Sequence, residues 1–386
     1  DPAGKEGLAN MVSGLLDEGA GELDSQAFQG RLADQSISLS FSASLDGFSG
    51  RMKALTRNRE EAFGLLRLAV TEPRFDAPAV DRIRAQIQTG LAAGANNPNR
   101  IAQQTFREAV FGDHPYSRPV TGTAESVAAI TEMDLQIFVT RRLARSALIV
   151  GVVGDVTAAE LGALLDTTFG DLPERAEAFT IPQAVPGGAG EVIVVERDNP
   201  QSRVVFGHRG VSRDDPDYYA ALVLNHVLGG GSFTSRLYDE VREKRGLAYS
   251  VFSYLLPLEN AALWMGGAGT ENGAVAQSID LIRGQWANVQ EFAISQDELD
   301  RAKANLIGSF GLRFDNTSSI AGTLVAVQFR DLGINYLNRR NDLIDAVTLD
   351  DVRRVAERIL DPAALTVVVV GKPEGLAATR TVTDGG

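Results

Sequence analysis

Three segments of the first half of the chain recur in the second half at a nearly constant offset. Residues 80–87, VDRIRAQI, resemble residues 299–306, LDRAKANL. Residues 129–131 and 147–154, AIT and ALIVGVVG, resemble residues 346–348 and 364–371, AVT and ALTVVVVG. The offset is 219 for the first pair of segments and 217 for the other two. Chance similarity would not hold this register over three separated segments, so the sequence predicts a duplicated domain.

The residue pattern inside each half is that of an α+β domain. Alternating apolar residues from Ile37 to Leu45 predict a half-buried antiparallel strand, and the apolar run 148–153 predicts another strand. Helical spacing runs through residues 5–19, 25–35, 60–70 and 77–93. We therefore predict two duplicated α/β-sandwich domains, each an antiparallel or mixed sheet packed against helices.

The domain boundary follows from length and composition. A chain of 386 residues is too long for one ordinary core. A stretch rich in Pro, Ala and Gly ends in PGGAG at 186–190 and is the candidate linker. The predicted domains are residues 1–172 and 191–386, joined by 173–190.

The duplication leaves two predicted strands of the second half without counterparts in the first. Residues 192–196 and 203–210 read as strands that precede the dipeptide Asp215-Pro216. The matching dipeptide of the first half is Asp1-Pro2. We therefore expect roughly two dozen residues or more to be missing from the front of the first domain, either cleaved or disordered.

Composition excludes several classes of function. Acidic residues outnumber basic ones by 50 to 37, and the net charge of -13 argues against nucleic-acid binding, which depends on Lys and Arg contacts to phosphate. The chain has no cysteine, so disulfides, thiol nucleophiles and thiolate metal sites are excluded. The chain contains no run of eighteen apolar residues, so the sequence predicts no membrane span.

The stretch from Gly229 to Tyr254 reads GGGSFTSRLYDEVREKRGLAYSVFSY and carries the candidate functional residues. Its opening loop consists of Gly229, Gly230, Gly231 and Ser232. The glycines can take positive φ and approach a ligand closely, so we expect a mobile loop that touches a substrate or a partner. Taken alone, however, three glycines more often form a plain connection between helices.

A helix is predicted to follow the glycines, because apolar residues recur there every four positions (Phe233, Leu237 and Val241). Ser235 suits the N-cap and Gly246 the stop, and a strand rich in aromatic residues comes next. Arg242 then lies at the end of the helix, and Tyr249 lies seven residues later in the strand. A surface ion pair and an interface tyrosine would explain them separately. Together they could also form an oxyanion clamp, because a guanidinium and a phenol both donate hydrogen bonds to a developing negative charge.

A complete catalytic apparatus is absent from the sequence. No zinc-binding H-E-x-x-H or H-x-x-E-H motif occurs, and neither does G-x-S-x-G, a P-loop or a dinucleotide fingerprint. None of the three histidines has a second ligand at helical spacing, so we interpret all three as structural: His114, His208 and His226.

The sequence resembles the insulinase/pitrilysin-like peptidases, the inverted zincins that include the mitochondrial processing peptidase and bacterial two-subunit relatives. The resemblance covers essentially the whole chain and rests on KEGLA, on NNP…FGDHPYSRPVTGT, on the two VVG segments and above all on SRLYDEVREKRGLAYS. It implies duplicated α+β domains that form half of a clam shell around a peptide chamber. It also implies that Arg242 and Tyr249 reach the zinc site and hold the substrate carbonyl and its tetrahedral intermediate.

The chain departs from the family where the metal should bind. The resemblance puts Asn10, Ser13 and Gly14 at the places of the first His, the catalytic Glu and the second His. The third ligand, a Glu, falls at about Thr89 or Gly90. These residues cannot supply three zinc ligands or a general base, so we expect no cofactor in this chain and zinc in a partner subunit.

We therefore expect the non-catalytic subunit of a heterodimeric zinc metallopeptidase. It would pair with a homologous zinc-binding subunit, supply Arg242 and Tyr249 in trans and act on peptides or unfolded segments. The alternative is a peptidase-fold scaffold or peptide-binding protein with no catalytic role, and a peptidase that works alone is excluded by the missing ligands. The start at Asp1 and the resemblance to exported bacterial pairs favour the periplasm, with the cytoplasm as the alternative.

Overall fold

The structure, a computed structural model, describes residues 1–382. It consists of two compact units, and each is assembled from separate stretches of the chain. Unit 1 comprises residues 1–94, 118–180 and 314–331, and unit 2 comprises residues 95–117, 181–313 and 332–386. Each half of the sequence therefore contributes one segment to the unit that is built mainly from the other half.

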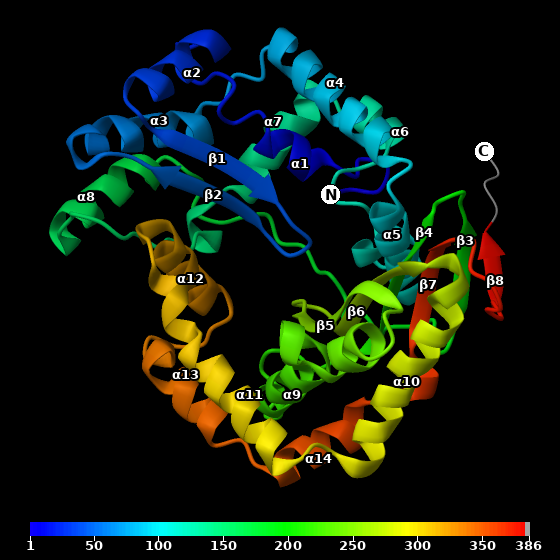
Figure 1. The fold of residues 1–386 in the computed structure, drawn as a ribbon. Helices are drawn as coiled ribbons and strands as arrows, with labels where there is room; N and C mark the ends of the chain where they lie inside the picture. Colours follow the sequence, from blue (N-terminus) through cyan, green and yellow to red (C-terminus); the bar gives the residue numbers. More distant parts are fainter. Residues whose placement is uncertain (383–386) are drawn as a thin grey trace. The chain divides into compact units, whose positions relative to one another are not determined.

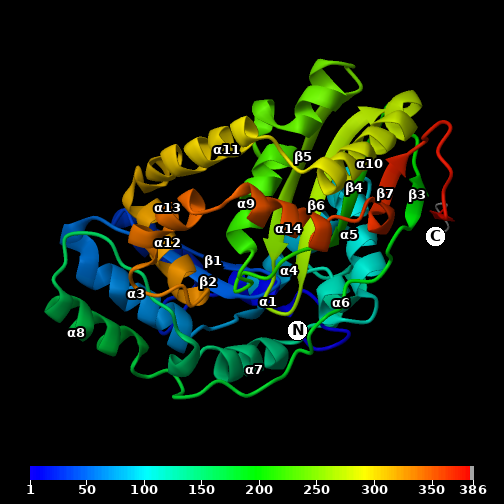
Figure 2. The same ribbon diagram turned by 90° about the horizontal axis from the view of Figure 1, so that it is seen from below.

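Unit 2 is built on a six-stranded mixed sheet with the order β5-β6-β4-β7-β3-β8, and Figure 2 shows the first five of these strands side by side. Neighbouring strands from β5 to β7 are antiparallel, whereas β3 runs parallel to β7 and to β8. The strands that the sequence predicts at 192–196 and 203–210 are confirmed. The bounds are β3 (Val192–Glu196), β4 (Gln201–Arg209), β5 (Ala248–Pro257), β6 (Ala262–Glu271), β7 (Thr366–Gly371) and β8 (Arg380–Val382).

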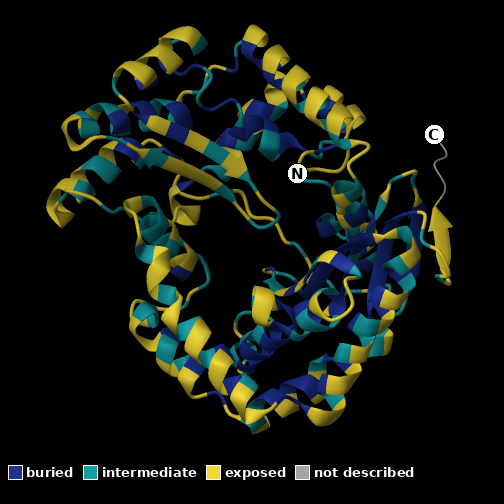
Figure 3. Ribbon diagram, viewed as in Figure 1, coloured by how far each residue is buried: buried dark blue, intermediate teal, exposed yellow. Residues whose placement is uncertain are grey.

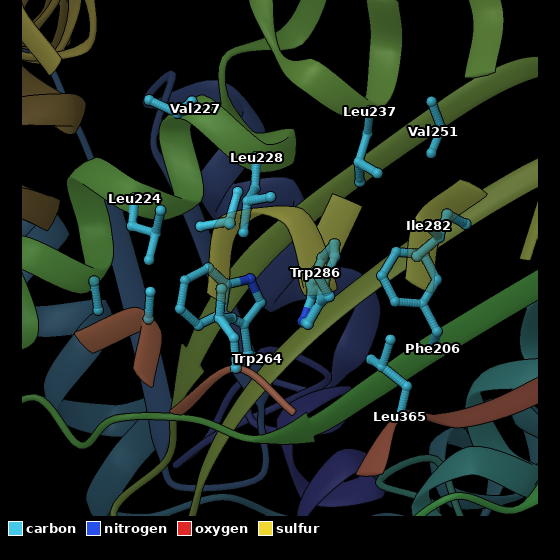
Figure 4. Close-up of a cluster of buried hydrophobic side chains, with 14 of the residues drawn as sticks. Phe206, Leu224, Val227, Leu228, Leu237, Val251, Trp264, Ile282, Trp286 and Leu365 are labelled. Atoms are coloured by element: carbon cyan, nitrogen blue, oxygen red, sulfur yellow. The ribbon is translucent and has the colours of Figure 1, made fainter. Parts of the chain in front are cut away.

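One face of this sheet carries the main core. Phe206 of β4 and Trp264 of β6 point to the same side and pack on Trp286, which lies on a helix (Figure 4). The ring centroids of Phe206 and Trp286 lie 5.7 Å apart in an edge-to-face arrangement. Each such ring removes a large apolar surface from water, which stabilises the fold by about 2–3 kcal/mol. The helices of this layer are α9 (Tyr218–Asn225), α10 (Val275–Phe292), α11 (Gln296–Gly308), α13 (Tyr336–Asp345) and α14 (Leu349–Ile359).

The opposite face of the same sheet is covered at β7 and β4 by α5 (Pro98–Phe111), a helix from the first half of the sequence (Figure 1). Asn97 caps this helix and Pro98 occupies its first turn, where a missing N–H costs nothing. A side chain at Gly207 would lie 2.9 Å from the Phe106 ring, so the glycine lets α5 approach the sheet. We refer to this side of the sheet as the α5 face.

Unit 1 has only a two-stranded sheet, in which β1 (Ser38–Ala43) pairs antiparallel with β2 (Phe48–Lys53). Most residues of β1 and β2 are exposed or half-buried, whereas the central strands of unit 2 are buried (Figure 3). The helices are α1 (Leu8–Ser13), α2 (Ser25–Asp34), α3 (Arg59–Thr71), α4 (Ala77–Gly94), α6 (Ala124–Ala129), α7 (Glu132–Arg142), α8 (Ala158–Phe169) and α12 (Thr317–Phe329). No helix among residues 1–382 is both long enough and apolar enough to cross a bilayer.

The repeated segments begin equivalent helices in the two units. Thr131 caps α7 and Thr348 caps α14, and in both cases an acidic residue three positions later completes a capping box. The segments at 80–87 and 299–306 likewise lie in α4 and α11. The structure is thus a mixed α+β fold in which sheets pack against helices, as the sequence predicts.

The predicted strand at residues 148–153 is wrong. Its counterpart β7 is hydrogen-bonded on one side to β3 and on the other to β4. In the part of unit 1 that the structure describes, no strand occupies either position, so the segment has no ladder to join. Helix α12 packs against it instead: Gln328 donates a hydrogen bond to the carbonyl of Val150 (3.1 Å), and a side chain at Gly151 would lie 2.8 Å from the carbonyl of Ala321.

Candidate functional site

The three glycines do not form the loop that the sequence predicts. They close a π-helical turn, His226–Gly230, that continues from α9, and none of the three has a positive φ. A Cβ at Gly229 would lie 2.5 Å from the backbone nitrogen of Ser253. Glycine is therefore required so that the turn can pack against β5. The expectation of a loop that uses positive φ at these positions is wrong, and the positive φ belongs to Ser232.

The exposed part of this connection is the short 3-10 turn Ser232–Thr234. Phe233 is 73% exposed at its tip, so its predicted place on the apolar face of the following helix is wrong. The chain enters that helix only after Ser235, whose hydroxyl accepts a hydrogen bond from the amide of Tyr238 (3.4 Å). At the other end Gly246 has φ 62 and donates its N–H to the carbonyl of Arg242 (2.8 Å). The predicted N-cap and C-terminal stop are confirmed.

Arg242 lies near the end of the π-helical segment Tyr238–Glu243, and an aromatic residue positions its charge. Its guanidinium carbon lies 4.9 Å from the centre of the Tyr238 ring, within the range of a cation–π interaction. Phe233 packs edge-on against the same ring, with 5.0 Å between the centroids. The exposed tip of the glycine connection is thus linked through Tyr238 to Arg242.

Tyr249 occupies an irregular position in β5. Ala248 pairs with Thr270 and Ser250 with Gly269, so Tyr249 is an extra residue that has no partner on β6. Such a β-bulge redirects a side chain and is common beside functional sites. The Tyr249 side chain is 60% exposed. A large ring at this position stabilises little by burial, so its place at the surface has no evident structural purpose.

The two candidate residues lie at the ends of neighbouring elements. The amide of Leu247 donates a hydrogen bond to the carbonyl of Val241 (3.0 Å), which fixes the turn between the helix and β5. No hydrogen bond or ring contact joins Arg242 directly to Tyr249 in the described residues. The structure therefore places both side chains at one turn and leaves their donor groups unconnected to each other.

A bidentate ion pair anchors the helix that carries Arg242. Nε and Nη2 of Arg236 donate to the two carboxylate oxygens of Glu298 at 2.7 and 2.8 Å, and Nη1 donates to Asn288 at 2.9 Å. Burial by itself would raise the pKa of Glu298, but the hydrogen bonds from Arg236 and Ser295 lower it to about 2. This contact is not predicted from the sequence, although the Ser295-x-x-Glu298 pattern of a capping box marks the carboxylate.

The residues at the family's metal positions do not fit a zinc site. On α1 the Ser13 hydroxyl donates to the carbonyl of Asn10 (2.8 Å), and Ser13 itself is buried. A Cβ at Gly14 would lie 3.3 Å from the Cγ2 of Ile83, so a larger side chain there would require Ile83 of α4 to move. Gly90, further along α4, has open space beside it and no side chain to offer. Residues 1–382 contain no cluster of three His, Asp or Glu side chains that could hold a metal ion.

The histidines lie apart and serve packing or loops. His208 is buried, accepts a hydrogen bond from the Trp286 indole (2.9 Å) and contacts the carbonyl of Arg209 (2.6 Å). Burial lowers the pKa of His208, so it is neutral at physiological pH. His114 contacts the carbonyl of Pro182 (2.9 Å). These contacts agree with the structural interpretation of His208 and His114.

Comparison with known proteins shows the family. Residues 129–306 match the family described as "Peptidase M16 inactive domain". An uncharacterized zinc protease of Streptomyces coelicolor is 30% identical over 349 residues, which cover 83% of this chain and 74% of that protein. The chain belongs to the M16 peptidase family. It is an M16 peptidase-like protein, and its residues at the family's metal positions do not fit zinc.

Other M16 relatives span nearly the whole chain. The non-peptidase homolog YmxG of Helicobacter pylori is 26% identical over 365 residues, covering 94% of this chain and 84% of that protein. A crystal structure of a peptidase M16 inactive domain from Pseudomonas fluorescens superimposes with a TM-score of 0.90 at 27% identity, over 98% of this chain and 90% of that one. The M16 fold thus extends over both units.

Proposed function

We propose that this chain is the non-catalytic subunit of a heterodimeric zinc metallopeptidase that cleaves peptides or unfolded protein segments. A homologous M16 subunit would hold the zinc, since the residues at the metal positions of this chain do not fit it. This chain would contribute Arg242 and Tyr249 in trans. The observation that carries the proposal is the β-bulge at Tyr249, which exposes a phenol beside the turn where Arg242 ends its helix.

These two side chains suit the stabilisation of an oxyanion. A guanidinium carries a fixed positive charge, and a phenol donates one hydrogen bond without carrying charge. Aimed at the substrate carbonyl, they would bind more strongly as negative charge develops on its oxygen. Tyr238 is then a positioning residue, because its ring supports the guanidinium of Arg242.

The turn Ser232–Thr234 is the part of the glycine connection that can meet a substrate or the partner. Gly229, Gly230 and Gly231 serve the packing beneath it, so alanine at these positions would confuse folding with function. Phe233→Ala removes the exposed tip and its edge-on contact with Tyr238 and leaves the packing of the glycines intact. We expect this variant to melt like the wild type and to lower peptide cleavage by the pair. Unchanged cleavage would show that the turn is only a connection.

The decisive experiment mixes the chain with its zinc-binding homologue and measures peptide cleavage. Loss of one oxyanion donor costs roughly 100–1000-fold in kcat. Tyr249→Phe and Arg242→Ala should therefore lower kcat by about that factor while the two chains still associate. Arg245→Ala is the matched control: Arg245 is three residues further along the same helix end and bonds to Glu240. It should change kcat less than about threefold.

The alternative function, a scaffold or peptide-binding protein without a catalytic role, predicts another outcome. Arg242→Ala and Tyr249→Phe would then leave cleavage by the mixed chains within a few-fold of the wild type, as Arg245→Ala does. Absence of any association between this chain and zinc-binding homologues would also favour the scaffold.

A further inference from the structure

The α5 face of the unit 2 sheet is covered only in part. Helix α5 packs on β7 and β4, and Phe252 and Tyr254 of β5 remain exposed on the same face. On this face lie Arg203 of β4 and Phe252 and Tyr254 of β5. Arg107 reaches from α5 to the neighbourhood of Tyr254. We call these four residues the arginine–aromatic platform. All of them belong to unit 2.

Two glycines of β6 form the floor of the platform. A Cβ at Gly269 would lie 2.3 Å from the position of an Arg203 terminal nitrogen, and one at Gly267 would lie 3.1 Å from the Phe252 ring. The guanidinium and the ring therefore rest directly on the strand. Phe252 and Tyr254 stack at 6.1 Å between centroids and are 45% and 38% exposed. Arg203 and the two stacked rings thus lie on the same face of the sheet, above glycines of β6.

The positive charges of the platform lack acidic partners. Arg203 makes no hydrogen bond or ion pair within residues 1–382, although the chain as a whole is strongly acidic. The Nε atom of Arg107 is buried without a hydrogen-bond partner in the described residues, and its Nη2 donates to the neutral amide of Gln104. Burial lowers the pKa of Arg107, and the exposed Glu108 beside it offsets this only in part. A half-buried guanidinium without a carboxylate is stabilised by any anion that reaches it.

The spacing of the platform suits an extended peptide. Tyr254 of β5 is level with Met265 of β6 and Gly207 of β4, and Gly207 lies four residues after Arg203. Arg107 lies near Tyr254. Four residues of strand span roughly 13 Å, so acidic side chains at positions i and i+4 of an extended peptide would face the two arginines. The side chain at i+2 would lie over Phe252.

We propose that the arginine–aromatic platform binds extended acidic peptides of the pattern acid–x–apolar–x–acid. Charge-assisted hydrogen bonds to Arg203 and Arg107 would hold the two carboxylates, and the central apolar side chain would stack on Phe252. This inference rests on the proposed function, because it names the class of peptide that the heterodimer would select. An aromatic and cationic surface can also bind single-stranded nucleic acid, but the net charge of -13 opposes that ligand.

The test measures fluorescence anisotropy of short labelled peptides with the isolated chain. One peptide contains Glu-Ser-Phe-Ser-Glu, and its counterpart contains Lys-Ser-Phe-Ser-Lys. A third carries the two Glu residues at i and i+2. The first should bind about tenfold more tightly than either of the others, and its affinity should fall as salt is added. Equal affinities for the acidic and basic peptides, or tighter binding of a labelled oligothymidylate, would overturn the proposal.

Variants then locate the binding surface. Arg203→Gln combined with Arg107→Gln should reduce the affinity for the acidic peptide to that of the lysine peptide, and Phe252→Ala should reduce it about fivefold. Arg301→Gln is the matched control, because Arg301 is exposed on α11 and pairs with Asp297. A loss as large in Arg301→Gln would show that binding is not at the platform.

The peptide series on the wild-type chain keeps the test valid if the double variant does not fold. The assay also needs no partner and no cleavage. A failure of the acidic peptide to bind the platform is therefore distinguished from a failure of Arg242 and Tyr249 to support cleavage.

Discussion

The pair of Arg236 and Glu298 makes the stability of unit 2 depend on pH in a way that can be calculated. Both nitrogens of the guanidinium fork contact the carboxylate, and both side chains are about one-fifth exposed. The pKa of Glu298 falls from 4.5 to about 2. At 1.36 kcal/mol for each pKa unit this is worth roughly 3 kcal/mol, and screening by solvent reduces it to about 2 kcal/mol.

The sign follows from where the proton binds. The unfolded chain takes up a proton at Glu298 near pH 4.5, whereas the folded chain does so only near pH 2. The stabilisation is therefore complete above pH 4.5 and is lost as the pH falls from there towards 2. Between pH 7 and pH 3.5 the pair should lose about 1 kcal/mol of its contribution.

Urea unfolding of the wild type, Arg236→Ala, Glu298→Gln and the double variant at pH 7 and pH 3.5 measures this loss. The coupling free energy between the two residues should be about 2 kcal/mol at pH 7 and about 1 kcal/mol at pH 3.5. The cycle cancels the effects of other carboxylates, which titrate in all four proteins. A coupling energy that is the same at both pH values would refute the idea that Arg236 depresses the pKa of Glu298.

Three further predictions follow from the structure. Because burial lowers the pKa of His208 and of His226 below the ordinary 6.5, the protein should melt at a lower temperature at pH 5.5 than at pH 7.5, and His208→Gln should remove part of this difference; an unchanged difference in His208→Gln would contradict it. Gly229→Ala should lower the free energy of unfolding in urea by about 1–3 kcal/mol, whereas Gly284→Ala, on open space in α10, should raise it by about 0.5–1 kcal/mol. The dialysed chain should contain no stoichiometric zinc by elemental analysis, and Asn10→His with Gly14→His should not restore peptidase activity; one tightly held zinc per wild-type chain would show that the ligand assignment is wrong.

The fold class could be read from the sequence because the duplication fixes a register for both halves. The repeated segments AIT and AVT also prove equivalent in the structure, where Thr131 and Thr348 each cap a helix. The sequence does not show to which unit α5 and α12 belong, because an amphipathic helix does not reveal which part of the fold it will cover. The strand predicted at 148–153 failed for a similar reason, since a strand needs neighbours that its own residues do not specify.

The candidate site was predictable only as a set of residues. The helix stop at Gly246 and the place of Tyr249 in a strand follow from local chemistry. The bulge that exposes Tyr249 depends on a mismatch of pairing with β6, and the support of Arg242 by Tyr238 depends on the π-helical turn. Neither has a recognisable sequence pattern. The glycines were misread because close packing and positive φ both select glycine.

The exchange of helices has a consequence for the order in which a growing chain can fold. Unit 1 includes residues 314–331, which are synthesised long after its remaining segments end at residue 180. At 5–20 residues per second, α12 emerges roughly 10–30 s later than the segment it covers at 148–153. During that interval Val150, Gly151 and their neighbours lack the helix that packs on them. A chaperone that binds apolar segments on the ribosome would therefore engage the nascent chain there, and a ribosome stalled between residues 180 and 314 would display an incomplete unit 1.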